Sequence, residues 1–324
     1  MQNKDQLLPY RVGGLLYTPA LNSGIGEKIA EHSIPNLSSV ALCLEDSVED
    51  SALNQAEKEL CRTLARLEAC EALPLIFVRV RTPQHLLKIH RMLGGLSELL
   101  CGYVLPKFDL SNAEQYLDLL FDVNSSRSSA LHIMPILESG MVANIMHRRE
   151  NLIQIKGVLD ADKEHILNVR VGGNDFCNLF GVRRRENQTI YEIGVIRDIL
   201  SDVVNVFGSD YIVSGPVWEY FGQDPAAPWA EGLRKEMALD FINGFIGKTA
   251  IHPAQLPVIA ECLKPSKTDY EDAKKILQWT SDGRAVQKSA SGARMNEQKC
   301  HTRWARKIAA LAEIYGTAEE RSHS

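Results

Sequence analysis

Short apolar segments and longer amphipathic segments alternate along most of the chain. Each apolar segment ends in polar, glycine or proline residues, as a buried strand does, and the segment that follows it has helical periodicity. Between residues 51 and 67 the apolar side chains fall at helical spacing, which predicts an amphipathic helix. The pattern predicts eight strands: Gly14–Tyr17, Val40–Leu44, Leu75–Val80, Gly102–Leu105, Leu131–Leu137, Ile166–Val171, Tyr211–Val213 and Phe245–Ile251.

The spacing of these strands favours a closed barrel. The polar residues that end successive strands are separated by steps that range from 28 residues (Thr18 to Asp46) to 41 residues (Asn174 to Gly215). Eight β-α units of this length are what a (β/α)8 barrel, or TIM barrel, of ~250 residues requires. An open doubly wound sheet also fits the alternation, but no GxGxxG motif opens the first helix. We therefore predict an α/β fold of the TIM-barrel type.

The pattern changes after Leu263. Residues 264–267 have the composition of a linker, and helices are predicted from about Asp269 to Thr280 and from about Lys299 to Tyr315. This tail is too short to form a domain of its own, so we expect it to pack on the barrel or on a neighbouring subunit. The predicted organisation is a catalytic barrel over residues 1–263 and a C-terminal helical extension and lid over residues 264–324.

Composition and charge narrow the class of protein. The 324 residues are 45% hydrophobic and 24% charged, which suffices for a buried core and excludes disorder for most of the chain. Lys and Arg number 36 against 41 Asp and Glu, so neither nucleic acid nor an anionic membrane is an expected partner. The sequence has no signal peptide or membrane-spanning stretch, and its seven cysteines are scattered without a CxxC pair. We expect a cytoplasmic protein with reduced thiols.

Polar side chains that follow the predicted strands carry the candidate chemistry. The active site of a TIM barrel lies at the carboxyl ends of its strands, so these side chains are expected to converge there. Carboxylates from different strands suit Mg²⁺, which takes one or two of them and completes its shell with water and substrate oxygens. Arginine and lysine nearby can hold a substrate carboxylate and stabilise a developing enolate. The candidates are Glu45, Asp46, Arg79, Arg81, Lys107, Glu138, Asn174, Asp175 and His252.

Seven short segments stand in an order that is found in one known family. They are Leu15–Ala20, Cys43–Val48, Phe77–Val80, Val104–Lys107, Ile136–Glu138, Val171–Phe176 and Gly247–Gln255. With them, the chain resembles the HpcH/HpaI aldolase and citrate lyase β-subunit family of (β/α)8 enzymes from about residue 13 to about residue 260. The most specific parts are Leu-Glu-Asp-Ser-Val at 44–48 and Gly-Lys-x-x-Ile-His-Pro-x-Gln at 247–255.

The resemblance implies a magnesium-dependent lyase or aldolase. Such an enzyme cleaves or forms a carbon–carbon bond next to a carbonyl, through a metal-stabilised enolate. The implied partner is a small anionic oxo or hydroxy acid, or its coenzyme A thioester. A homo-oligomer, a trimer or a hexamer, is the implied assembly.

The resemblance also implies roles for individual residues. Glu138 and Asp175 are the implied ligands of Mg²⁺, and Arg79 faces the enolate or carbonyl oxygen. The other expected roles are orientation of metal-bound water by Glu45, Asp46 and Asn174, catalysis by Lys107, and substrate binding by Arg79, Arg81 and Gly215.

Some positions depart from the family's usual pattern. Gly13-Gly14 stands where the family often has Arg-Ser, and Arg81 replaces a usual asparagine and adds a positive charge. Both changes weaken the case for citryl- or malyl-coenzyme A as the substrate. With them, the sequence resembles a divergent bacterial subgroup of carbon–carbon bond lyases. Residues 292–297 resemble a C-terminal segment that closes over the barrel of a neighbouring subunit, with Glu297 in place of the catalytic acid. Partial desolvation of a carboxyl there would raise its pKa toward the range that suits protonation of an enolate carbon.

Other interpretations of these residues stay open at this point. Glu138 and Asp175 could cap helices, Lys107 could pair with Asp109, and His252 is expected to shape the last barrel loop rather than to act in catalysis. Two alternative functions use the same fold. One is a catalytically weak barrel that serves as the binding subunit of a multi-enzyme complex, and the other is an acyl-coenzyme A hydrolase with the same site.

Overall fold

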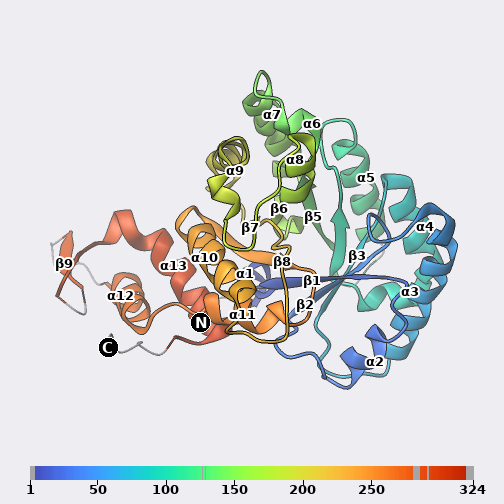
Figure 1. The fold of residues 1–324 in the computed structure, drawn as a ribbon, viewed down its shortest axis with the longest axis horizontal. Helices are drawn as coiled ribbons and strands as arrows, with labels where there is room; N and C mark the ends of the chain where they lie inside the picture. The colour runs from blue at the N-terminus through green and yellow to red at the C-terminus, as the bar shows by residue number, and fades with distance from the viewer. Residues whose placement is uncertain (1–3, 126, 128, 280–284, 290–291, 319–324) are drawn as a thin grey trace. The chain divides into compact units, whose positions relative to one another are not determined.

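Eight parallel strands close into a barrel (Figure 1). The computed structural model describes residues 4–125, 127, 129–279, 285–289 and 292–318. The strands follow one another around the barrel in chain order, and β8 closes it by pairing with β1, with Gly14 opposite Lys248. The predicted (β/α)8 fold is therefore confirmed.

All eight predicted strands are present, with ends that differ by a few residues. Their bounds are β1 Gly14–Pro19, β2 Ser39–Cys43, β3 Leu75–Arg79, β4 Gly102–Leu105, β5 His132–Leu137, β6 Val169–Val171, β7 Val213–Gly215 and β8 Phe245–Ala250. The largest difference is at β6, which begins at Val169 instead of Ile166, and β7 is shifted by two residues, from Tyr211–Val213 to Val213–Gly215. The Tyr211 hydroxyl donates at 2.6 Å to Oδ1 of Asp160, the last residue of the helix over residues 148–160, so this aromatic residue belongs to the turn before the strand.

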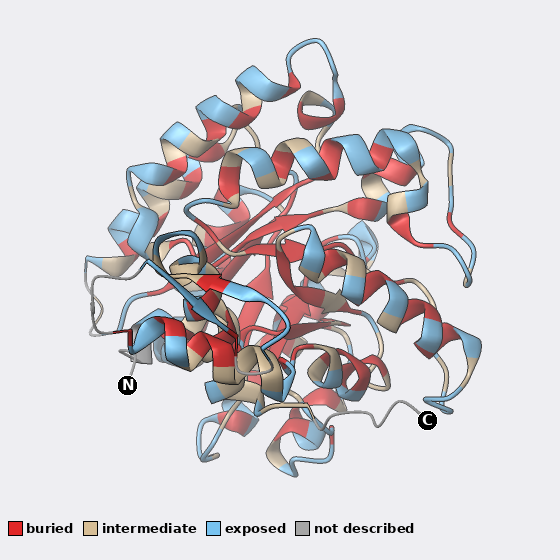
Figure 2. Ribbon diagram, turned by 90° about the vertical axis from the view of Figure 1, so that its left-hand side faces the viewer, coloured by how far each residue is buried: buried red, intermediate tan, exposed pale blue. Residues whose placement is uncertain are grey.

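Within residues 12–259, helices follow the strands and lie outside the barrel (Figure 2). The α-helices are α1 Lys4–Arg11, α2 Ile25–Ala30, α3 Leu53–Leu67, α4 Pro83–Leu93, α5 Ala113–Asn124, α6 Gly140–Ala143, α7 Arg148–Asp160, α8 Gly173–Leu179, α9 Gly194–Phe207, α10 Pro228–Ile242, α11 Gln255–Cys262, α12 Lys267–Leu277 and α13 Gln298–Tyr315. Short 3-10 turns are η1 Asp50–Ala52, η2 Gly94–Leu99, η3 Lys163–His165 and η4 Ile190–Glu192.

The helices pack their apolar faces on the strands, as their sequence periodicity predicts. In α3 the side chains of Ala56, Leu60, Leu64 and Leu67 are fully buried and recur at helical spacing. Figure 2 shows buried residues along the strands and on the inner faces of the surrounding helices, with exposed residues on the outer faces. This burial of apolar surface on both sides of the sheet fixes the carboxyl ends of the strands, where the site lies.

The chain divides into two compact units. One comprises Val12–Ile259 and contains the barrel, and the other combines Met1–Arg11 with Ala260–Ser324, as far as these residues are described. In the second unit the Tyr315 hydroxyl at the end of α13 donates to the Tyr10 carbonyl in α1 at 2.9 Å. This contact explains why the first helix is grouped with the C-terminal segment, a link that no local sequence pattern indicates.

The C-terminal unit contains the two helices that the sequence predicts and one element that it does not. Helix α12 starts at Lys267, where the Ser266 hydroxyl accepts from the Asp269 backbone N–H at 3.0 Å. Between α12 and α13, the short strands β9 Val286–Lys288 and β10 Met295–Glu297 form an antiparallel pair. None of the described helices combines the length and the apolar character needed to cross a membrane.

Candidate active site

A cavity of about 180 Å³ lies at the carboxyl ends of the barrel strands. Its walls combine charged side chains with the glycines that precede and begin α8. The lining residues are Tyr17, Asp46, Arg79, Ile136, Glu138, Arg170, Val171, Gly172, Gly173, Asn174, Asp175, Val217, Thr249 and Ile251. Five of the predicted site residues are in this set, namely Asp46, Arg79, Glu138, Asn174 and Asp175.

Arg79 is the most strongly paired cation of the cavity. It is the last residue of β3 and is 7% exposed, and its Nη2 lies 2.7 Å from Glu45 Oε2, 3.1 Å from Asp46 Oδ2 and 3.4 Å from Glu138 Oε1. Burial acts to lower its pKa, but the surrounding acidic groups raise it overall, so the guanidinium stays charged. A buried arginine with three carboxylates around it is a rigid cation in the wall of the cavity.

Lys107 contributes through its backbone as well as its side chain. Its φ angle is 49°, in the left-handed region that residues other than glycine rarely adopt, and its backbone N–H donates to Glu138 Oε1 at 2.8 Å. Its Nζ donates to Glu45 Oε1 at 3.0 Å. Asp109 instead accepts from the Ser111 backbone N–H at 2.9 Å, so the pairing of Lys107 with Asp109 is not observed.

Glu138 is held with one oxygen engaged and one available. It follows β5, is 6% exposed, and its Oε1 accepts from Lys107 and Arg79. Within the described residues no donor is bonded to Oε2, and a Cβ at Gly172 would lie only 2.2 Å from that atom. Burial raises the pKa of Glu138 to about 8, with Arg79 opposing and Asp175 reinforcing the change. The glycine at 172 therefore leaves the space in which this carboxylate faces the cavity.

Asp175 lies in the first turn of α8 and faces the same cavity. It is half-buried, and its charge is one of the groups that act on Glu138. The N-cap positions of α6 and α8 are occupied by Ser139 and Gly172, so neither predicted metal ligand caps a helix. Both carboxylates are therefore available to a ligand.

The charges around the cavity do not balance. Four carboxyl groups, from Glu45, Asp46, Glu138 and Asp175, accompany the three cations Arg79, Lys107 and Arg170. Hard oxygen donors with a carboxylate excess are the donor set that Mg²⁺ prefers, and the open oxygen of Glu138 fits such an ion. The residues present thus fit a divalent cation at this position.

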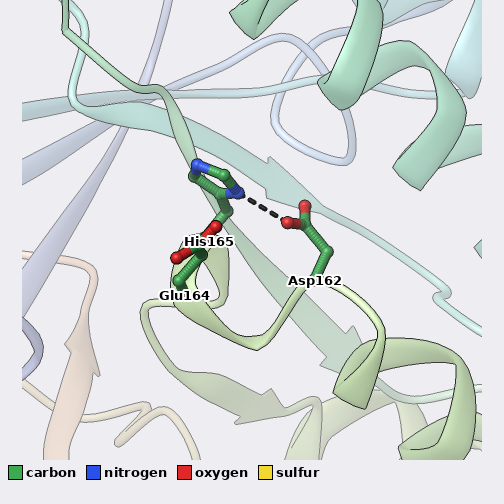
Figure 3. Close-up of side chains that lie close together, drawn as sticks. All are labelled: Asp162, Glu164 and His165. Atoms are coloured by element: carbon green, nitrogen blue, oxygen red, sulfur yellow. Dashed lines mark hydrogen bonds and ion pairs between the residues drawn. The ribbon is translucent and has the colours of Figure 1, made fainter.

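A second group of ligand-type side chains lies before β6, at the amino end of the strand (Figure 3). The ligand atoms of Asp162, Glu164 and His165 lie within 4.8 Å of one another. His165 Nδ1 and Asp162 Oδ1 are 2.6 Å apart and form a hydrogen bond, so these two atoms already have hydrogen-bond partners without a metal ion. The group is remote along the strand from the charged cavity, and we assign no site to it.

Comparison with protein families identifies the chain. A family model described as C-C bond lyase of the TIM-barrel fold matches residues 6–317. The chain belongs to this family. It is thus an enzyme of the carbon–carbon lyase class, as the sequence resemblance predicts. No curated protein matches it in sequence.

Solved structures with the same fold include three that span most of the lyase. CitE of Mycobacterium tuberculosis, in complex with magnesium, acetoacetate and coenzyme A, has 19% identity and a TM-score of 0.62, over 94% of this chain and 99% of its own. A citrate lyase of Burkholderia xenovorans has 13% identity and a TM-score of 0.69, over 94% and 93%. Malate synthase of Haloferax volcanii, with magnesium and glyoxylate, has 14% identity and a TM-score of 0.61, over 92% and 87%. At these identities the likeness concerns the fold.

Two of the predicted substrate-binding residues of the lyase do not line the cavity. The Arg81 guanidinium donates to the Leu44 carbonyl at 2.7 Å and the Val48 carbonyl at 2.5 Å and pairs with Asp50, so it holds the loop after β2. Gly215, at the end of β7, is buried, and a Cβ there would lie 2.6 Å from Asp240 Oδ2. Its lack of a side chain serves packing against a buried carboxylate.

Glu297, the predicted acid, lies in the C-terminal unit of the lyase. It ends β10 and precedes α13, and its backbone N–H donates to His301 Nδ1 at 2.9 Å. Its carboxylate accepts from Cys300 Sγ at 3.3 Å.

Three polar side chains of the cavity are absent from the predicted site residues. Tyr17, Arg170 and Thr249 come from β1, β6 and β8. The Arg79 guanidinium lies over the Tyr17 ring, 5.5 Å from its centroid. Arg170 stands between two valines in a buried strand, which is the same signal that singles out Arg79 at the end of its apolar run.

His252 matches its structural interpretation. Its ring stacks on Phe221 with a centroid separation of 4.4 Å, and its Nδ1 accepts from the Ala254 backbone N–H at 3.2 Å. These contacts shape the loop that follows β8.

Proposed function

We propose that this lyase makes or breaks a carbon–carbon bond next to the carbonyl of a small oxo or hydroxy acid, with Mg²⁺ as its cofactor. The observation that carries the proposal is the excess of carboxylates at the cavity, where Glu138 keeps one oxygen open beside Asp175. The magnesium complexes of CitE and malate synthase support it by analogy.

In this proposal Glu138 and Asp175 hold the metal. Bound there, Mg²⁺ would supply a Lewis acid that polarises a carbonyl oxygen and offsets charge on the neighbouring oxygen. Asp46, Glu45 and Asn174 lie beside these ligands and orient water and the Arg79 side chain. The role of the protein is to keep the carboxylates fixed before the substrate arrives, which the Lys107 backbone N–H does for Glu138.

Arg79 is the proposed stabiliser of negative charge on the substrate. It remains protonated and rigid between Glu45, Asp46 and Glu138, so its remaining N–H groups have a fixed direction toward the cavity. Lys107 supports it, because its Nζ shares Glu45 and so balances part of the acidic cluster. The volume of about 180 Å³ suits a small acid, or the acyl part of a coenzyme A thioester.

The test of this proposal is metal binding followed by turnover. We expect Mg²⁺ together with oxalate to raise the melting temperature of the wild-type protein, and the double variant Glu138→Gln, Asp175→Asn to abolish that rise. Glu164→Gln, which changes the separate group before β6, is the control and should keep it. An equal rise in the double variant would contradict the proposed metal site.

The reaction itself is tested by release of an oxo acid. A panel of hydroxy acids and acyl-coenzyme A compounds with Mg²⁺ should contain at least one that the wild-type protein cleaves. No cleavage of any of them, with magnesium binding intact, would contradict the lyase reaction and favour the binding-subunit alternative.

Glu297 is proposed as an acid that acts across an interface of a cytoplasmic homo-oligomer. Two inactive variants, Glu297→Gln and Glu138→Gln, test this when they are mixed under conditions that exchange subunits. Mixed oligomers then contain sites with both native residues, and part of the activity returns. Full activity of Glu297→Gln alone, or no recovery after confirmed exchange, would remove Glu297 from the mechanism.

A further inference from the structure

Arg170 is a buried cation at the base of the cavity. It is the middle residue of β6, is 1% exposed, and lines the cavity together with Thr249. In the strand register it pairs with Ile136, two residues before Glu138, so its backbone lies deeper in the barrel than the proposed metal ligand.

The hydrogen bonds of Arg170 are made to neutral oxygens. Its Nη1 donates to Asn168 Oδ1 at 3.1 Å and its Nη2 donates to Thr249 Oγ1 at 2.7 Å. Its Nε–H is buried and has no hydrogen-bond partner in the part of the chain that is described. A buried donor of this kind is costly unless a ligand completes its bonding.

No carboxylate of the described residues lies within 4.0 Å of Arg170, in contrast to the other buried cations of the barrel. Arg79, Arg184 and Lys248 each contact at least one carboxylate. The nearby charge of Arg79 repels Arg170 further, and burial lowers the pKa of Arg170 while Tyr17 opposes that change. A fully buried guanidinium that no carboxylate contacts is unfavourable by itself, so an anion that reaches Arg170 directly would be stabilised there.

We propose that Arg170 binds a carboxylate of the substrate other than the group held at the metal, so that the substrate is a dicarboxylic acid. This inference rests on the proposed function, because it takes the metal end of the cavity as the place of reaction. The Thr249 hydroxyl holds the guanidinium, and the planar fork of arginine matches the two oxygens of a carboxylate. A singly charged carboxylate also tolerates the acidic cluster nearby better than a doubly charged phosphate does.

The experiment compares acids that differ only in the far carboxylate. Malate and 2-hydroxybutyrate form one pair, and 2-oxoglutarate and 2-oxopentanoate form another, and each is titrated with Mg²⁺ by calorimetry. We expect the wild-type protein to bind at least one diacid roughly 10- to 150-fold more tightly than its matched monoacid. In Arg170→Met that preference should disappear, while the affinity for the monoacid stays within about 2-fold.

Two further variants separate ligand binding from folding. Arg148→Met removes another buried arginine, paired with Asp202 outside the cavity, and should keep the preference for the diacid. Arg170→Lys keeps the charge but loses the planar fork, and should retain only part of the preference, which gives a readout if the methionine variant does not fold. Because Arg170 has no ion pair to lose, Arg170→Met should melt at or above the wild-type temperature, and Arg148→Met should melt below it.

The outcomes distinguish this inference from the proposed function. Equal binding of diacid and monoacid in the presence of Mg²⁺ would overturn the role of Arg170 and leave the magnesium site standing. Absence of any magnesium-dependent binding would overturn the proposed function first. Tighter binding of inorganic phosphate than of either diacid, lost in Arg170→Met, would overturn the assignment to a carboxylate.

Discussion

Two clusters of charged side chains lie in the same barrel and differ in the ratio of carboxylates to cations. The first, around Arg79, has four carboxyl groups with three cations, Arg170 included, and borders the cavity. The second contains Arg184, Glu236, Asp240 and Lys248, two cations with two carboxylates. All four side chains of the second cluster are almost fully buried, and none of them lines the cavity.

The ratio of carboxylates to cations distinguishes charged side chains that stabilise the fold of this barrel from those that are available to a ligand. In the balanced cluster, Arg184 and Lys248 each contact a carboxylate. For example, Lys248 Nζ lies 2.9 Å from Glu236 Oε1 and 2.6 Å from Asp240 Oδ2. Its partners also hold backbone, since Glu236 Oε2 accepts from the Ile190 N–H at 2.8 Å. In the unbalanced cluster carboxyl groups outnumber cations at an open cavity, and either a proton on Glu138 or a bound cation balances the charge.

The largest expected effect is on the stability of the balanced cluster. Glu236→Gln leaves two buried cations with one carboxylate, so we expect the free energy of unfolding to fall by about 3–5 kcal/mol. For a domain of this size that corresponds to a melting temperature lower by roughly 6–20 °C. Thermal unfolding measures it, with the exposed Glu231→Gln on the same helix as the control. A decrease in the free energy of unfolding of less than about 1 kcal/mol would contradict the structural role of the balanced cluster.

In the unbalanced cluster the same kind of change should act on turnover instead of stability. Arg79→Lys keeps a positive charge among three carboxylates but loses the planar fork, so we expect turnover to fall by about 100-fold, or ~2.7 kcal/mol in the barrier, with a small change in melting temperature. Steady-state rates on the substrate found by the panel measure the effect. An active lysine variant would show that Arg79 is not the stabiliser of substrate charge.

The open oxygen of Glu138 makes magnesium binding depend on pH. Because burial raises the pKa of Glu138 to about 8, from 4.5 in the unfolded chain, this group contributes stability below about pH 4.5 that is lost as the pH rises to about 8. Magnesium needs the ionised form, so its affinity should increase by up to tenfold per pH unit toward pH 8 and then level off. Titrations of Mg²⁺ between pH 6 and pH 9 test this, and a flat profile in the wild-type protein would contradict it.

The smallest effect is expected at Arg81, which lies next to the unbalanced cluster but holds a loop. Arg81→Gln removes contacts to the Leu44 and Val48 carbonyls and to Asp50, so we expect a loss of about 1 kcal/mol in stability and less than about a 2-fold change in KM. A large rise in KM with unchanged stability would instead show that Arg81 takes part in substrate binding.

Sequence periodicity predicted the barrel because each strand is buried on both faces and therefore reads as a continuous apolar run. The ends of those runs also identified Arg79, Glu138 and Asp175, since strand ends converge in a closed barrel. The sequence analysis did not identify Arg170, because this residue lies inside β6 and not after its end. The pairing of β9 with β10 was not predicted either. Each of these strands has only three residues, most of them polar or exposed, and shows no alternation of apolar and polar positions.

Tertiary context also decides what a residue at the right position does. Arg81 and Lys107 both follow strands, yet the first reaches back to the loop after β2 and the second reaches Glu45. The grouping of α1 with the C-terminal segment depends on contacts between residues that are far apart in sequence, such as Tyr10 and Tyr315. No local pattern encodes such contacts.

The left-handed backbone at Lys107 has a consequence for engineering the enzyme. Since the backbone N–H at this position orients Glu138, the side chain is free to vary without disturbing that carboxylate. Glycine or asparagine, which adopt this conformation readily, would keep the orientation and remove the charge. A library at position 107 would therefore tune the electrostatic potential of the pocket through loss of the Nζ contact to Glu45, while the backbone contact that orients Glu138 is kept.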